Sequence, residues 1–135
     1  MSAGSNNVKR GTNLERRVAK FLGGRRFWVS SGERIDVESP DFLVQCKKVT
    51  KMPLAELVRL AEEMEGWANT DRHDTNGQNW KDKVGIVAVE LFRKPIPGKG
   101  VATPSPTVYL MTQKQMQKLF DKMGYSVPLP PLDTE

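Results

Sequence analysis

Apolar side chains recur with helical spacing in three parts of the chain. The first predicted helix covers residues 13–22 and presents one apolar face. Its apolar positions are Leu14, Val18, Phe21 and Leu22. The Gly23-Gly24 pair that follows is typical of a helix end. The same spacing predicts a second helix with Pro53 in its first turn and a last helix that is capped by Thr112.

Shorter runs rich in β-branched and aromatic residues predict strands. They cover residues 27–29, 34–38, 42–48, 84–92 and 107–111. The predicted order is therefore α-β-β-β-α-β-β-α, in which a helix separates the third strand from the fourth. A helical crossover of this kind allows two strands to run parallel. The pattern predicts an α/β fold with a mixed central sheet flanked by helices.

The two ends of the chain differ in composition from its middle. Residues 1–11 are rich in serine, glycine and asparagine, and we expect them to form a flexible N-terminal arm. Residues 124–135 contain three prolines and are expected to form an extended tail. Residues 12–123 are left as a single domain, which suits a chain of 135 residues.

Positive charge is concentrated in the first part of the chain. The net charge is +5, and residues 1–51 hold 11 lysines and arginines against 5 acidic residues. Residues 52–135 hold 10 basic against 11 acidic residues. An ordinary solvated face is one interpretation of such a charge excess. Its concentration in one part of the chain favours a surface that binds the phosphates of nucleic acid.

Composition also excludes several kinds of site. A single cysteine excludes an internal disulfide and a four-cysteine zinc site, and a single histidine excludes a metal site with two histidines. No apolar run reaches the roughly 18 residues that a membrane-spanning helix needs. We therefore expect a cytoplasmic protein with no membrane partner.

Residues 34–47 are predicted to form a hairpin that turns at Pro40-Asp41. In this register Asp36 lies opposite Gln45, and Val37 lies opposite Val44. Side chains alternate between the faces of a strand. One face, expected to lie in the core, carries Ile35, Val37, Phe42, Val44 and Cys46. The other face carries Arg34, Asp36, Glu38, Gln45 and Lys47. Paired Cβ atoms lie about 5 Å apart, so we expect Asp36, Gln45 and Lys47 to converge.

These groups are suited to a hard divalent cation. Mg²⁺ prefers oxygen ligands and keeps several waters. Asp36 offers a carboxylate, Gln45 an amide oxygen and Cys46 its backbone carbonyl. Lys47 is placed to orient a water or to offset charge on a phosphate. Glu15 reaches the same point if the first helix packs on the hairpin.

A longer series of residues carries a resemblance to a known family. It comprises Lys9-Arg10-Gly11, Leu14-Glu15-Arg16, Ser31-Gly32, Ile35-Asp36-Val37, Val44-Gln45-Cys46-Lys47 and the following Lys48-Val49-Thr50-Lys51. In residues, spacing and order the series resembles the archaeal-type Holliday junction resolvases of the PD-(D/E)XK nuclease superfamily. The likeness continues more loosely to residue 120.

The resemblance implies a restriction-endonuclease-like fold and a Mg²⁺-dependent homodimer that nicks four-way DNA junctions, with Mn²⁺ as a substitute. Glu15 matches the glutamate carried by the helix, and Asp36 matches the metal-binding aspartate. Gln45 stands where the motif has an acid, and Lys47 is the motif lysine. Ser30 or Ser31 matches the loop serine of the family. The expected DNA contacts are Lys9, Arg10, Arg16, Arg17, Ser31, Lys48 and Lys51.

One departure from the family keeps other functions open. Gln45 replaces a carboxylate with a neutral amide, so one negative charge is missing unless Glu33 or Glu38 supplies it. One alternative is a repair or restriction-like nuclease on the same fold. Another is a DNA-junction-binding protein that does not cut, and RNA is a weaker third target. The resemblance suits a phage or archaeal recombination setting, with action in the host cytoplasm if the protein is phage-encoded.

Overall fold

The structure of the protein is a computed structural model. The structure describes residues 3–26, 35–51, 53–74, 76–91, 98 and 105–125, with side chains from residue 13 onward. The helices are α1 (Ala3–Leu22), α2 (Leu54–Trp67) and α3 (Gln113–Lys122), with a 3₁₀ turn at Trp80–Asp82. The strands are β1 (Arg25–Arg26), β2 (Val37–Glu38), β3 (Phe42–Val49), β4 (Val84–Leu91) and β5 (Val108–Leu110). The predicted α/β fold and its element order are confirmed.

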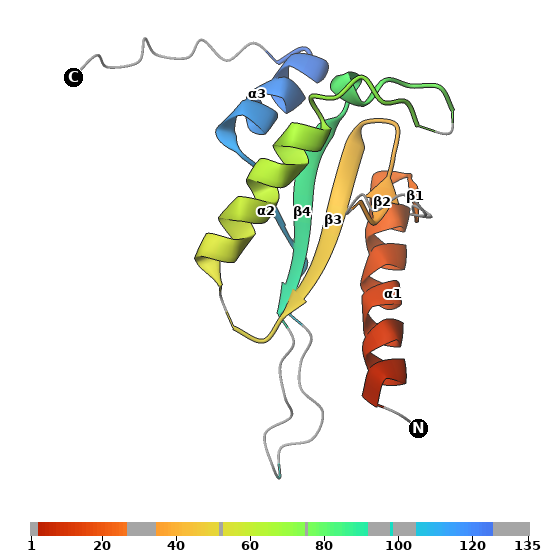
Figure 1. Ribbon diagram of the computed structural model, residues 1–135, viewed down its shortest axis with the longest axis vertical. Coiled ribbons are helices and arrows are strands. Elements are labelled where there is room, and N and C mark those ends of the chain that lie inside the picture. Colours follow the sequence, from red (N-terminus) through yellow and green to blue (C-terminus); the bar gives the residue numbers. More distant parts are fainter. Residues whose placement is uncertain are drawn as a thin grey trace, which may run out of the picture.

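The described strands form one mixed sheet in the order β1-β2-β3-β4-β5. β1, β2 and β3 are antiparallel neighbours, and β5 is antiparallel to β4. β3 and β4 run parallel, because α2 carries the chain from the end of one to the start of the other (Figure 1). The predicted pairing of Val37 with Val44 is confirmed.

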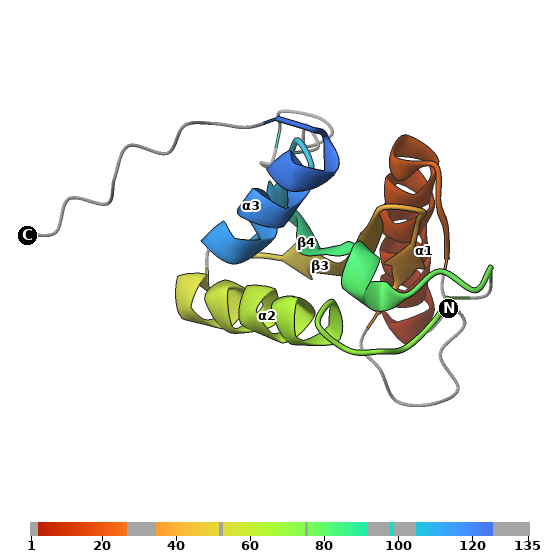
Figure 2. The ribbon, with the colours of Figure 1, turned by 90° about the horizontal axis from the view of Figure 1, so that it is seen from above.

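Helices cover both faces of this sheet. On one face α1 packs over the even-numbered residues of β3 and β4, where Leu14 and Val18 contact Val44 and Ile86. α2 packs on the opposite face over the odd-numbered residues (Figure 2). α3 adds Leu119 to the core beside α1. Both faces of β3 are therefore occupied, whereas the sequence pattern predicts one apolar face and one polar face.

Several element ends differ from the prediction. α1 begins at Ala3, so residues 3–11 of the expected arm continue the helix. Extending a helix that has already formed costs less than starting one, which lets poor helix formers join its end. Gly23 takes a positive φ of 68° and ends α1 as expected. The strand predicted at 27–29 lies outside the described residues, and β1 precedes it.

The last helix begins as the sequence indicates. The Thr112 side chain accepts a hydrogen bond from the Gln115 backbone N–H at 3.3 Å. This is the contact of an N-cap, which satisfies one of the free donors at a helix start. None of the helices in the described ranges has the length and hydropathy needed to cross a membrane.

Candidate active site

The hairpin of β2 and β3 contains an irregularity just before β2. The Asp36 backbone N–H donates to the Val44 carbonyl at 2.8 Å, although Val37 is the residue registered with Val44. Two successive residues thus face one residue of the partner strand, which is the arrangement of a β-bulge. A bulge re-aims side chains, and Ile35 accordingly packs in the core beside α2 rather than with Val37.

Asp36 lies on the α1 side of the sheet in a partly buried position. Its Oδ2 accepts a hydrogen bond from the Cys46 backbone N–H at 2.8 Å. Burial, with a smaller contribution from the negative charge of Glu15, raises the pKa of Asp36 from 3.8 to about 6. The Cys46 N–H and the Arg26 guanidinium oppose this rise in pKa. Asp36 is thus a carboxyl group whose charge the fold disfavours.

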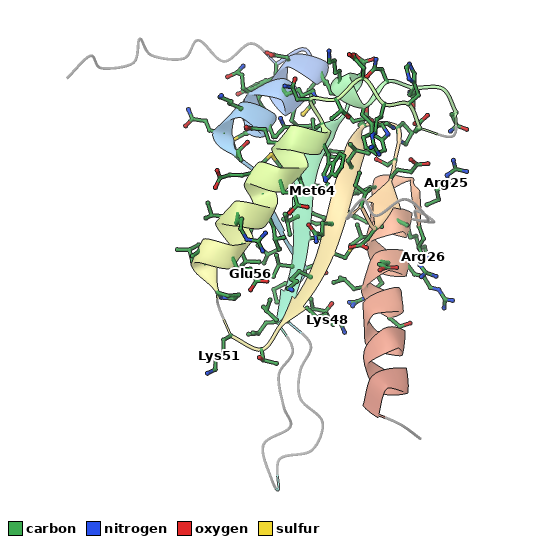
Figure 3. All side chains as sticks on the ribbon, in the orientation of Figure 1. Arg25, Arg26, Lys48, Lys51, Glu56 and Met64 are labelled. Carbon is green, nitrogen blue, oxygen red and sulfur yellow. The ribbon has the colours of Figure 1, made fainter. Side chains whose placement is uncertain are left out.

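Glu15 approaches Asp36 from α1. This helix packs against β1, β2 and β3, and Glu15 occupies its inward-facing side. Glu15 Oε2 accepts a hydrogen bond from Arg26 Nε at 2.9 Å, which fixes the carboxylate beside β1. Figure 3 shows Arg26 next to α1. Glu15 therefore lies on the same side of the sheet as Asp36, close enough for its charge to raise the pKa of Asp36, as the sequence predicts.

Gln45 and Lys47 lie on the opposite face. Lys47 Nζ forms an ion pair with Glu56 Oε1 of α2 at 3.2 Å. Gln45 lies between Leu43 and Lys47 on the same side by strand alternation. Its Oε1 is buried and has no hydrogen-bond partner within the described part of the chain. The predicted convergence of Asp36 with Gln45 and Lys47 is wrong, because the bulge shifts Asp36 to the other face.

Cys46 and Lys48 lie on the α1 side of β3, and the backbone of Cys46 is bonded to Asp36. Burial raises the pKa of the Cys46 thiol well above its usual range, and the negative charges of Asp36 and Glu15 add to the rise. The thiol therefore stays protonated and is not a nucleophile. Cys46 contacts Asp36 through its backbone N–H, whereas the sequence predicts a role for its backbone carbonyl.

Sequence reasoning missed one acidic residue on this face. Glu90 lies at the end of β4, is 6% exposed, and is registered with Lys48. Its Oε1 pairs with Lys48 Nζ at 3.1 Å, and its Oε2 pairs with the Arg17 guanidinium of α1. The signal that could have found it is a single acidic residue within the otherwise apolar run of β4.

The carboxylates of Glu15 and Asp36 could supply some, but not all, of the ligands of a divalent cation. Mg²⁺ is commonly held by one or two carboxylates while water and substrate phosphates complete its shell. Glu15 and Asp36 match that requirement, and Gln45 does not join them. The described residues contain no group of three or more His, Cys, Asp or Glu side chains that could hold a metal. The site therefore fits a cation that two carboxylates would hold and water or phosphate would complete.

The other predicted residues lie at several separate places in the fold. Arg16 and Arg17 are exposed on α1, and Lys51 is exposed just after β3. Glu38 is buried and pairs with Arg25 at 3.0 Å. The side chains of Lys9 and Arg10 lie outside the described part, as do Ser30, Ser31 and Glu33.

Comparisons of the chain with protein-family models, with curated proteins and with solved structures found no match.

Proposed function

We propose that the protein is a metal-dependent endonuclease of the PD-(D/E)XK type that cuts four-way DNA junctions. The observation that carries the proposal is that Glu15 of α1 lies on the same side of the sheet as Asp36 at the bulge before β2, where its charge acts on Asp36. These are the two carboxylates that the resemblance assigns to the metal site. The mixed sheet, with helices on both faces, also agrees with the family fold.

Glu15 and Asp36 are the residues that would hold the cation. A bound divalent cation polarises a phosphate and lowers the pKa of a water that attacks it. Arg26 orients Glu15, and the Cys46 N–H orients Asp36, so neither carboxylate rotates freely. Because the pKa of Asp36 is raised to about 6, this residue carries its full negative charge only above neutral pH unless a cation is bound.

The proposed substrate is supported by charge and by the resemblance. Arg16, Lys20 and Lys51 are exposed and available for contacts to DNA phosphates. Contacts of this kind give strong salt dependence and little sequence readout. A four-way junction has two-fold symmetry, and two symmetric nicks need two active sites. We therefore propose that the protein acts as a homodimer.

The proposal is tested by cleavage of a labelled four-way junction and of a matched linear duplex. Wild type, Asp36→Asn and Glu15→Gln are compared in Mg²⁺, in Mn²⁺ and in EDTA. Asp41→Asn is the matched control, since Asp41 is an exposed aspartate that pairs with Lys122 at 3.4 Å. We expect paired nicks in the junction for wild type and for Asp41→Asn, and none for the two site variants. Equal cutting of the linear duplex would instead indicate a repair or restriction-like nuclease.

A second candidate is a junction-binding protein that does not cut. The placement of Gln45 on the opposite face favours it, because the Gln45 amide then adds no ligand and, among the described residues, Glu15 and Asp36 alone are left for a cation. This candidate predicts that wild type binds the junction with the same affinity in EDTA and in Mg²⁺. It also predicts no cleavage in either divalent metal.

A further inference from the structure

A buried carboxylate joins two cations on the α1 side of the sheet. Glu90 is the single charged residue of β4, and both of its side-chain oxygens are used. Oε1 pairs with Lys48 Nζ of β3 at 3.1 Å, while Oε2 pairs with the Arg17 guanidinium of α1. Three elements that are distant in the sequence thus meet at one carboxylate.

This arrangement leaves an excess of positive charge facing solvent. The side chain of Glu90 is 8% exposed, whereas those of Arg17 and Lys48 are 51% and 22% exposed. Burying a carboxylate carries a desolvation cost that a nonpolar residue would avoid. Here the carboxylate fixes two donors whose combined charge exceeds its own. Donors that are held in place in this way are suited to phosphate oxygens.

Lys48 places the cluster of Arg17, Lys48 and Glu90 on the same face of the sheet as Asp36. Asp36 is bonded to the Cys46 N–H, and Lys48 follows Cys46 by two residues on the same face of β3. Two residues of a strand span about 7 Å. Lys47 points instead to α2 and pairs with Glu56. Figure 3 shows Lys48 beside α1 and Glu56 on α2.

We propose that Arg17 and Lys48, positioned by Glu90, form the phosphate-binding site next to Asp36. In this arrangement Lys48 takes the role that the sequence motif gives to Lys47. The ligand is a DNA phosphodiester. The inference rests on the proposed function, since it assigns the residues that would bind the phosphate at the same site.

The first experiment compares the two adjacent lysines. Lys48→Met and Lys47→Met each remove one charge and break one pair with a glutamate, at 3.1 Å and 3.2 Å respectively. Lys81→Met is the control for loss of a surface charge, since Lys81 pairs with Asp71 near the 3₁₀ turn. The readouts are junction binding in EDTA at several salt concentrations and single-turnover cleavage in Mg²⁺.

We expect Lys48→Met to slow cleavage by about 100-fold. Its affinity for the junction should fall, and the slope of log affinity against log salt concentration should decrease by about one, as expected for the loss of one phosphate contact. Lys47→Met should cut substantially faster than Lys48→Met, and Lys81→Met should match wild type. A greater loss for Lys47→Met than for Lys48→Met, or equal losses for the two, overturns the inference.

The second experiment tests the positioning role of Glu90. Glu90→Gln keeps the size of the side chain and removes its negative charge. We expect junction binding to stay equal or to tighten, because net positive charge rises, while single-turnover cleavage slows by about tenfold or more. Glu90→Asp, which restores the charge, should recover part of the rate. Weaker binding together with a lower thermal midpoint would mean that Glu90 is only structural.

The two proposals fail in different ways. If wild type cuts the junction and Lys48→Met cuts equally well, the inference is wrong and the nuclease proposal stands. If wild type binds but never cuts, the nuclease proposal is wrong. In that case junction binding tests the phosphate site. A larger loss of affinity in Lys48→Met than in Lys47→Met supports the inference, and an equal or smaller loss overturns it. If wild type neither binds nor cuts, both are wrong.

Discussion

The surroundings of Asp36 disfavour the negative charge of its carboxylate. We therefore predict that replacing this carboxylate with a neutral side chain stabilises the fold. Burial and Glu15 raise the pKa of Asp36 from 3.8 to about 6. One pKa unit corresponds to about 1.4 kcal/mol, so a shift of this size corresponds to at most about 3 kcal/mol. Asp36 is partly exposed, and solvent screening reduces this to about 1–2 kcal/mol.

Asp36→Asn keeps the size of the side chain and an oxygen that accepts from the Cys46 N–H. We therefore expect it to raise the free energy of unfolding by about 1–2 kcal/mol at pH 8. The pKa of Asp36 is higher in the folded state, so the native state binds more protons between about pH 4 and pH 6. The stability of wild type relative to Asp36→Asn consequently rises as the pH falls through this window. The advantage of asparagine should disappear near pH 4.

The assay is urea unfolding at pH 8 and pH 4 in EDTA, with Asp41→Asn as the exposed control. The reasoning is refuted if Asp36→Asn is less stable than wild type at pH 8. It is also refuted if the gain in free energy of unfolding is the same at pH 4. A stabilised variant that no longer cuts would show that Asp36 is retained for function at a cost to stability.

Three further predictions concern packing and metal affinity. Lys83→Met should lose about 3–5 kcal/mol in urea unfolding, because it leaves the buried Asp74 carboxylate without its partner at 2.7 Å; a loss below 1 kcal/mol contradicts this. Gly85→Ala should lose about 2–3 kcal/mol, since a Cβ there would lie 2.2 Å from the Met64 carbonyl oxygen of α2; an unchanged unfolding midpoint contradicts it. Mg²⁺ affinity measured by calorimetry should rise from pH 5 to pH 7 as Asp36 loses its proton, whereas an affinity independent of pH counts against Asp36 as a ligand.

Periodicity was sufficient to predict the architecture of the protein. The helical spacing of Leu14 and Val18 predicts the face that α1 buries, and the apolar run of β4 predicts a strand buried on both sides. The turn at Pro40-Asp41 fixes the pairing of Val37 with Val44. The approach of Glu15 to Asp36 follows once α1 packs on the hairpin.

Periodicity could not predict which residues lie together at the site. A β-bulge adds one residue to a strand, and an alternating pattern gives no sign of it before the partner strand is known. The bulge at Asp36 places its side chain on the α1 side of the sheet, whereas Gln45 and Lys47 lie on the α2 side. Glu90 was missed for a related reason. Its partners Arg17 and Lys48 come from two other elements, which only the fold brings together.

The central claim is that Glu15 and Asp36 hold a divalent cation for DNA cleavage. Its most direct test is single-turnover cleavage of a labelled four-way junction by wild type and by Asp36→Asn, in Mg²⁺ and in EDTA. We predict paired nicks for wild type in Mg²⁺ alone and none for Asp36→Asn, although this variant binds the junction and unfolds at higher urea concentration. Cleavage by Asp36→Asn at the wild-type rate, or binding by wild type without cleavage in any divalent metal, would contradict the claim.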